Sequence, residues 1–385
     1  MRVFKFGGAS VNSVEAVRNM ASIVRGHLGE EPLVVVVSAM GKTTNALERL
    51  VPGIGIAEEE RQQVYRQVVD YHQGIADGLG LVEQAGMHAL LEELRKRMAC
   101  APTGYNFDYD QTVSLGELIS TTIVSAYLNQ EGMANRWMDA RQLIRTDATY
   151  RDARVDWSAS KQQMTSQLST LNSQLYITQG FIAGAPDGST TTLGREGSDY
   201  SAAILSHCLG AQRMTIWKDV PGFLNADPKH FPNTVKIDRM PYNEAIELAY
   251  YGASVIHPKT VKPLQNKQIE LHIKSFLQPE APGSVIGPYS HIEPETPLYI
   301  VRHNQVLLSI LPKDFSFIAE DNLQTIFAAL SQAGVRVNLM QNSALSFSLC
   351  VDRNPILLGQ LQELLTPQFR LKWNEGLQLF TIRYY

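Results

Sequence analysis

The hydrophobic pattern near the N-terminus changes from strand to helix and back to strand. Residues 3–6 form a short apolar run that ends at a Gly-Gly pair, and a helix is expected over 14–28 with Asn12 or Ser13 as its N-cap. Residues 33–37 are apolar without alternation, which is typical of a strand buried on both faces of a parallel sheet. This order predicts a βαβ opening.

Helical and strand patterns continue to alternate further along the chain. Residues 57–99 have helical spacing and many charges, and we expect them to form a helical insertion or cover. Residues 103–113 are expected to form a loop, which opens a helix over 114–128. Strand segments at 175–184 and 212–223 enclose one more helix. The alternation predicts an α/β fold with a mainly parallel central sheet.

A change of composition divides the chain into two domains. Residues 279–297 contain five prolines, so we expect 281–297 to be a stiff linker, not a buried element, between domains at 1–280 and 298–385. In the second domain, strands are expected at 298–311, twice around 335–351 and at 377–384, with helices at 319–333 and 355–365. This βαββαβ order predicts a small ferredoxin-like α+β domain.

Composition and charge exclude several classes of protein. The chain has 385 residues, 44% of them hydrophobic, which suffices for a full core and excludes global disorder. Its net charge of −4 lacks the basic excess usual in nucleic-acid and membrane-surface binders. Three distant cysteines indicate neither a disulfide framework nor a zinc site, and there is no apolar run of about 18 residues that would span a membrane. We therefore expect a soluble cytoplasmic protein without nucleic-acid or membrane partners.

Two segments near the N-terminus have the composition of ligand-binding turns. A strand delivers Lys5 to Gly7 and Gly8 at a helix start, which combines one cation, open N–H groups and a helix dipole. A plain turn with a surface lysine explains the same residues. The next segment ends in Gly-Lys-Thr as a Walker A loop does, but a valine stands where that motif requires its first glycine. What remains is Ser38 and Thr44 at the end of a strand, the usual ligand position in an open α/β sheet.

Three further features combine charge with turns. Arg195, Ser198 and Asp199 stand at a helix N-terminus, where capping explains the serine and aspartate but not the arginine. Glu117 is expected in the first turn of its helix, where the helix dipole favours an acid. Residues 216–229 place an aromatic residue and lysines beside Pro-Gly and Asp-Pro turns, which fits either an adenine pocket or a plain loop.

Taken together and in this order, the motifs resemble the aspartate kinase branch of the amino acid kinase family. The resemblance spans about residues 2–262, and the C-terminal unit resembles that family's ACT domain. The motifs that carry it are KFGGAS, VVVSAMGKTTNAL, SLGELIS, DARQLIRTD, QGFIAG, TTLGREGSDYSA, WKDVPGF, NADPK and YGASVIHPKT. The resemblance implies an amino acid kinase-like sandwich that phosphorylates the side-chain carboxylate of L-aspartate with Mg-ATP, the first step towards lysine, threonine and methionine.

The resemblance also implies roles for individual residues. Lys5 and Asp199 would be catalytic, and the aspartate substrate would be bound by Ser38, Thr44, Glu117, Arg195 and Ser198. The nucleotide would be bound by Lys5, Gly7, Gly8, Lys218, Asp219, Phe223, Lys229 and Lys259. No residue is assigned as a metal ligand, although ATP and Mg²⁺ are expected as cofactors.

The chemistry of the reaction agrees with these residue types. An aspartate side chain has an unperturbed pKa near ~3.9, so the nucleophile needs no general base, and the obstacle is the repulsion between two anions. Lys5, the glycine amides and Mg²⁺ can offset that repulsion. Arg195 suits the α-carboxylate and Glu117 the α-ammonium, whereas Asp199 either orients Lys5 or helps hold the ammonium.

This chain departs from the family pattern at four positions. The family usually has Thr at Ala9, Gly at Glu196, Thr at Lys218 and a phosphate-contacting Lys at Ser254. The last substitution matters most, and we expect Lys218 or Lys259 to supply the missing charge.

The small domain would dimerise and bind an amino-acid effector if it is an ACT domain. Lysine-sensitive relatives commonly have Asp at Asn338 and Thr-Ser-Glu at 342–344, so lysine inhibition is doubtful here, while threonine or no effector remains open. A homodimer is implied, and dimerisation alone is an alternative role. Two alternatives to the whole function also stay open: a sister kinase with another acceptor, and an inactive amino-acid sensor.

Overall fold

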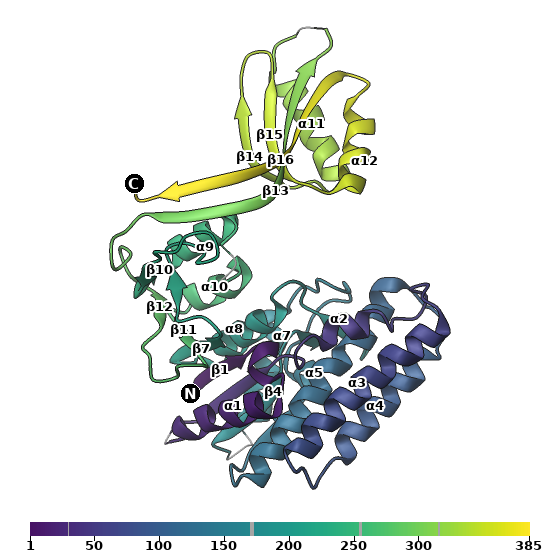
Figure 1. Ribbon diagram of the computed structural model, residues 1–385, viewed down its shortest axis with the longest axis vertical. Helices are drawn as coiled ribbons and strands as arrows, with labels where there is room; N and C mark the ends of the chain where they lie inside the picture. The colour runs from purple at the N-terminus through teal and green to yellow at the C-terminus, as the bar shows by residue number, and fades with distance from the viewer. Residues whose placement is uncertain (30, 170–172, 254–255, 315) are drawn as a thin grey trace. The chain divides into compact units, whose positions relative to one another are not determined.

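Two compact units make up the computed structural model, which describes residues 1–385 except 30, 170–172, 254–255 and 315 (Figure 1). The first unit consists of Met1–Leu224, Lys236–Ile246 and Val255–Glu295. The second consists of Asn225–Val235, Glu247–Ser254 and Thr296–Tyr385. Two segments from within residues 1–280 thus belong to the second unit.

The first unit is built on an eight-stranded sheet. Its strand order is β10-β12-β11-β7-β1-β2-β4-β3. The bounds are β1 (Arg2–Phe6), β2 (Leu33–Val37), β3 (Arg136–Met138), β4 (Leu175–Gln179), β7 (Arg213–Lys218), β10 (Arg239–Pro241), β11 (Glu270–Ser275) and β12 (Ser284–Gly287). Neighbouring strands are parallel except for β11 and β12, which confirms the predicted α/β fold class.

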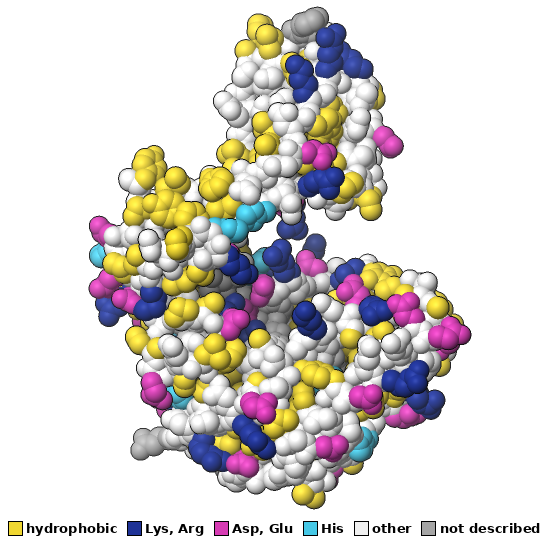
Figure 2. Space-filling model, viewed as in Figure 1, with side chains coloured by type: hydrophobic (Ala, Val, Ile, Leu, Met, Phe, Trp, Pro, Cys, Tyr) yellow, Lys and Arg dark blue, Asp and Glu magenta, His cyan; other side chains and the backbone are white. Residues whose placement is uncertain are grey.

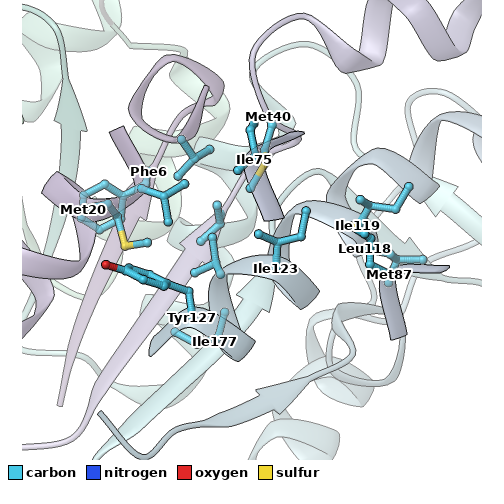
Figure 3. Packing of buried hydrophobic residues seen from close by; sticks show 14 of the residues in the cluster. Phe6, Met20, Met40, Ile75, Met87, Leu118, Ile119, Ile123, Tyr127 and Ile177 are labelled. Atoms are coloured by element: carbon cyan, nitrogen blue, oxygen red, sulfur yellow. The ribbon is translucent and has the colours of Figure 1, made fainter. Parts of the chain in front are cut away.

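Alternate residues of β1 point to the two faces of this sheet. Phe4 and Phe6 belong to a core that includes residues of α1 (Val14–Gly26), α3 (Glu58–Gly78), α4 (Ala85–Met98) and α5 (Tyr105–Gln130). Figure 3 shows part of this core, with Phe6 near Met20 and Tyr127. Because successive side chains of a strand alternate, Lys5 points to the opposite face. That face is covered by α8 (Gly197–Leu209), which contacts β1, β2 and β7.

The helices of the first face follow the sequence pattern. The Ser13 side chain accepts the N–H of Ala16 at 3.1 Å, so Ser13 is the N-cap of α1, which ends at Gly26. The helical cover expected over residues 57–99 is confirmed, because α3 and α4 fill it and pack beside α5 (Figure 1).

The loop expected over residues 103–113 is wrong, because α5 already begins at Tyr105. The Asp108 carboxylate accepts the N–H groups of Thr103 and Gly104 at 2.8 and 2.9 Å and satisfies donors at the helix start. Glu117 therefore lies in the middle of a helix of 26 residues and not in a first turn.

The proline-rich segment is also more ordered than expected. Residues 284–287, within the predicted linker at 281–297, form β12, which pairs with β10 and β11 and is largely buried. The prolines lie outside this strand, so composition marks the turns around it but not the strand itself.

The remaining elements are short or lie on the α8 side of the sheet. The helices are η1 (Gly8–Val11), α2 (Thr43–Glu48), α6 (Ala140–Leu143), α7 (Trp157–Ser169), α9 (Tyr242–Tyr251) and α10 (Pro258–Gln265). Two small antiparallel pairs are β5 (Ile182–Gly184) with β6 (Thr190–Thr192), and β8 (Phe223–Leu224) with β9 (Lys236–Ile237). Both α7 and α10 pack against α8. No helix among the described residues is long and apolar enough to cross a membrane.

The second unit has the predicted βαββαβ order. Its antiparallel sheet has the order β14-β15-β13-β16, and α11 and α12 pack together over an apolar core. The bounds are β13 (Leu298–Pro312), α11 (Glu320–Gln332), β14 (Val337–Asn342), β15 (Phe347–Asp352), α12 (Pro355–Leu365) and β16 (Phe369–Arg383). The last strand is longer than the 377–384 expected, and the fold is ferredoxin-like.

Candidate active site

A cavity of about 460 Å³ lies in the first unit, beyond the carboxyl ends of β1 and β2. This is where ligands bind in open α/β sheets. Residues from η1, α2, α5, α8 and the loops between them contribute to it. The lining residues are Lys5, Gly8, Ser38, Ala39, Gly41, Thr44, Glu117, Phe181, Gly194, Glu196, Gly197, Ser198 and Asp199.

Two lysines share one carboxylate that lines this cavity. The Lys5 ammonium lies 2.7 Å from Oδ1 of Asp199, and the Lys218 ammonium lies 3.6 Å from Oδ2. Lys218 ends β7, which runs parallel to β1, so both strands deliver their lysines to the same edge of the sheet. Asp199 stands in the first turn of α8 on the face that Lys5 reaches.

The electrostatics of this trio favour an anionic ligand. Asp199 is fully buried, and burial by itself would raise its pKa, but the charges of Lys5 and Lys218 outweigh burial and lower the pKa. The ionised trio therefore carries two positive charges against one negative charge. The surplus is local, because Figure 2 shows dark-blue and magenta side chains interspersed on the visible face, and the whole chain carries −4.

Glu117 presents the second notable carboxyl group in the cavity. Its Oε1 accepts the N–H of Ala39 at 3.3 Å, and its buried Oε2 has no hydrogen-bond partner within the described part of the chain. Burial raises the pKa of Glu117 to about 8, against a smaller opposing effect of the Ala39 N–H. A buried oxygen without a partner is costly, and a cationic ligand group would satisfy it.

The glycine turn after β1 packs closely against the backbone of residues 39–41. A Cβ atom on Gly8 would lie 2.8 Å from the carbonyl oxygens of Ala39 and Gly41, whereas one on Gly7 would meet only the Lys5 ammonium at 3.4 Å. The Gly8 carbonyl also accepts the Gly41 N–H at 3.0 Å. The turn and the 39–41 loop are thus locked together, and η1 begins at Gly8 beside Lys5.

The loop before α8 carries a further charged residue, which does not itself line the cavity. Arg195 is exposed and stands between Gly194 and Glu196, both of which line the cavity. Glu196 adopts φ +55°, in the left-handed region that favours glycine, which gives a physical reason for the glycine usual at this position in the family.

Six of the sequence-predicted residues line the cavity besides Lys5: Gly8, Ser38, Thr44, Glu117, Ser198 and Asp199. Lys218 reaches Asp199 without lining the cavity, Gly7 and Arg195 are chain neighbours of lining residues, and the remaining four predicted residues lie elsewhere. Asp219 is exposed and Phe223 is buried in the first unit, while Lys229 belongs to the second unit. The Lys259 ammonium forms an ion pair with Asp152, and Ser254 lies outside the described residues.

Some lining residues were not singled out from the sequence. Three of them have no polar side chain and contribute only backbone groups and room for a ligand, so the sequence offers no reason to choose them beyond their place in a motif. They are Ala39, Gly41 and Gly197. Phe181 has φ +70°, which is rare for a bulky residue, and its N–H is bound by the Ser201 hydroxyl at 2.9 Å. Only the structure reveals that conformation.

Comparisons with known proteins identify the family. Residues 1–275 match the model of the amino acid kinase family. The chain is 32% identical to lysine-sensitive aspartokinase 3 of Escherichia coli (strain K12), over 99% of this chain and 86% of that protein. It is 32% identical to the chloroplastic aspartokinase 2 of Arabidopsis thaliana, over 91% of this chain and 66% of that protein.

Solved structures give the same result. The structure resembles that of E. coli aspartokinase III in complex with lysine and aspartate, with a TM-score of 0.84 and 32% identity. It resembles the same enzyme in complex with aspartate and ADP, with a TM-score of 0.85 and 31% identity. Each match covers 99% of this chain and 86% of the other. The chain therefore belongs to the amino acid kinase family, in its aspartokinase branch.

Proposed function

We propose that this aspartokinase transfers the γ-phosphoryl group of ATP to the side-chain carboxylate of L-aspartate, giving 4-phospho-L-aspartate on the route to lysine, threonine and methionine. The observation that carries the proposal is the ion-paired trio of Lys5, Asp199 and Lys218, of which Lys5 and Asp199 are buried and line the cavity. Its two ammonium groups and one carboxylate give a net positive charge, which would offset the repulsion between the aspartate carboxylate and the phosphates of ATP. The E. coli relative bound to aspartate and ADP supports the same pair of ligands.

Catalysis in this site rests on charge and position. The aspartate nucleophile is ionised at neutral pH, so no general base is needed. Lys5 and the amides of Gly7 and Gly8 bind phosphate oxygens, and Asp199 holds the Lys5 ammonium in place for them. A fixed ammonium needs no reorganisation as negative charge redistributes in the transition state, which is the most effective form of electrostatic catalysis.

Recognition of aspartate uses other residues of the cavity and of the loop before α8. Glu117, whose Oε2 lacks a partner within the described chain, binds the α-ammonium. Arg195, between the lining residues Gly194 and Glu196, binds the α-carboxylate in a bidentate pair, and Ser38, Thr44 and Ser198 supply hydroxyl groups around the substrate.

Magnesium fits this site as part of the ATP complex. Within the described residues, no group of three acidic, histidine or cysteine side chains forms a cage for a metal ion, and Asp199 is already paired with two lysines. Mg²⁺ commonly keeps several waters and is held by substrate phosphates with one or two carboxylates. When bound, the ion neutralises phosphate charge.

We assign to Lys218 the charge that Ser254 lacks. Lys218 reaches the carboxylate that also holds Lys5, whereas Lys259 is paired with Asp152. Asp219, Phe223 and Lys229 remain proposed contacts of the nucleotide.

The direct test is ATP-dependent formation of aspartyl phosphate, trapped as the hydroxamate. We expect turnover with aspartate in preference to glutamate, acetylglutamate or nucleotides. Lys5→Ala should lower kcat by roughly 10²-fold or more, the scale of losing one preorganised donor. Lys218→Ala should raise the KM for ATP, and Lys259→Ala should leave it unchanged.

The outcomes separate the alternatives. Turnover with another acceptor would identify a sister kinase, and ATP binding without any turnover would indicate an inactive sensor. Near-normal kcat in Lys5→Ala, with an unchanged melting temperature, would remove Lys5 from the mechanism.

The ferredoxin-like unit is proposed to act as an ACT-type module of a cytoplasmic homodimer. It exposes large apolar side chains, which are typical of a protein–protein interface. These include Leu339 and Met340 on β14 and Phe380 and Ile382 on β16. Figure 2 shows such side chains gathered near the C-terminal end of β16. The proposed domains are 1–280, 281–297 and 298–385, with the strand β12 inside the middle segment.

A further inference from the structure

A fully buried carboxylate on α5 joins the helix of Glu117 to the strand that leads to Arg195. Asp110 has no exposed surface, and it precedes Glu117 by seven residues, about two helical turns, on the same side of α5. Its Oδ1 accepts the Thr192 hydroxyl at 2.7 Å. Its Oδ2 accepts the N–H groups of Thr192 and Arg151, each at 2.9 Å.

The groups bound by Asp110 define the path of the loop before α8. Thr192 ends β6, and its carbonyl accepts the Ala153 N–H at 3.0 Å, which fixes the 151–153 turn against the strand. Gly194 follows at φ +76° and passes so close to this turn that a Cβ atom there would lie 2.6 Å from Oδ1 of Asp152 and 3.2 Å from the Arg151 carbonyl oxygen. Arg195 is the next residue.

The donor pattern around Asp110 requires a carboxylate. Three donors converge on its two oxygens, and a carboxylate only accepts, whereas an amide would turn an NH₂ group towards one set of donors. Burial raises the pKa of Asp110, although hydrogen bonds from Arg151 and Thr192 act in the opposite direction. The Arg151 guanidinium packs over the rings of Tyr105 and Tyr109, at 5.2 and 4.4 Å from their centroids.

We propose that Asp110 is a positioning residue for the amino-acid substrate, which sets the Arg195 loop at a fixed distance from Glu117. The inference rests on the proposed function, in which these two residues bind the α-carboxylate and the α-ammonium. Both groups sit on one carbon atom of the substrate, so a small displacement of the loop weakens both contacts together. The lysines of the phosphate site lie on β1 and β7, outside the segments that Asp110 binds.

The test compares Asp110→Asn with Asp187→Asn in the full-length protein, using aspartate and ATP titrations. Asp187 is an exposed residue before β6 whose carboxylate accepts the N–H and hydroxyl of Ser189 at 2.9 and 2.6 Å, so it loses similar bonds away from the cavity. We expect Asp110→Asn to raise the KM for aspartate by about tenfold or more, on the scale of an unsatisfied buried group. The KM for ATP should stay within about twofold, and Asp187→Asn should match the wild type.

Thr192→Val keeps the test informative if Asp110→Asn does not fold. It removes the hydroxyl donor to Oδ1 and should raise the KM for aspartate selectively, by a smaller factor. An unchanged KM for aspartate in the folded variants overturns the inference, as does an equal rise in both KM values, which a general loss of structure would cause. If the wild type itself does not phosphorylate aspartate, the proposed function fails and this role fails with it. If the wild type does phosphorylate aspartate and the folded variants keep its KM for aspartate, only the positioning role fails.

Discussion

At the scale of single residues, Glu117 has a protonation state that the sequence does not reveal. The sequence indicates an acid near the substrate, but only the packing of α5 shows that this acid is buried and that its pKa is raised to about 8 without a ligand. An α-ammonium favours the ionised form, so the complex holds fewer protons than the free enzyme.

We predict that the KM for aspartate falls as pH rises from about 6 to about 8, with up to tenfold per pH unit below the pKa. Higher pH favours the state with fewer bound protons, which here is the complex, so binding also releases a proton. Calorimetry in buffers of different ionisation enthalpy measures that release. Glu117→Gln should bind aspartate weakly and without this dependence, and a flat profile in the wild type would show that Glu117 does not meet the ammonium.

The lysine positions were predictable to different degrees. Lys5 follows from its place between a strand and two glycines, because that local pattern by itself favours anion binding. The bond of Lys218 to Asp199 joins residues on different elements, and no local pattern encodes it. The ion pair of Lys259, on α10, with Asp152, in the 151–153 turn, likewise joins distant parts of the sequence.

At the scale of elements, the close packing of the turn after β1 predicts that Gly8 cannot be replaced by a larger residue without cost. Gly8→Ala would force its Cβ against two carbonyl oxygens at 2.8 Å, and backbone atoms there cannot move aside as a flexible side chain can. We expect the 39–41 loop to shift, with a loss of activity of at least about tenfold and a lower melting temperature.

Gly74→Ala on α3 is the matched control, because no atom lies within 4 Å of its added Cβ. Alanine favours a helix interior over glycine, so this variant should keep its activity and melt at an equal or higher temperature. Full activity in Gly8→Ala would show that the turn tolerates a side chain and is not the phosphate cradle.

The buried elements were predictable to different degrees. Strand β2 was predicted because a short unbroken apolar run is typical of a strand that is buried on both faces. The first part of α5 was missed because its buried positions are polar: Asp110 and Gln111 satisfy partners on β6, so the helix shows no apolar stripe. Strand β12 was missed because the prolines around it dominate the composition of a strand of only four residues.

At the scale of the whole molecule, the proposed regulation by amino acids would act through the second unit. Asn338 stands where lysine-sensitive relatives commonly have Asp, and its Oδ1 is held by the Arg302 guanidinium. Its Nδ2 donates to Gln305 and Asp352 at 2.7 and 3.0 Å. Asn338 is thus occupied by groups of its own unit and offers no negative charge to an incoming ammonium.

We therefore predict that millimolar lysine does not inhibit this enzyme, unlike a lysine-sensitive relative assayed in parallel. Titrations of lysine and threonine under identical aspartate concentrations provide the measurement. Inhibition by lysine would mean that its ammonium is recognised without the acid expected at this position. Light scattering of the full-length protein, with and without amino acids, tests the proposed homodimer.

The position of β12 determines how the protein can be divided. A fragment that stops at residue 280 lacks the strand that pairs with both β10 and β11, and it leaves their hydrogen-bonding edges open to association with other chains. The second unit, in turn, takes 225–235 and 247–254 from the middle of the sequence. No single cut separates the two units, so biosensors, crystallisation fragments and fusions are better designed around the intact polypeptide.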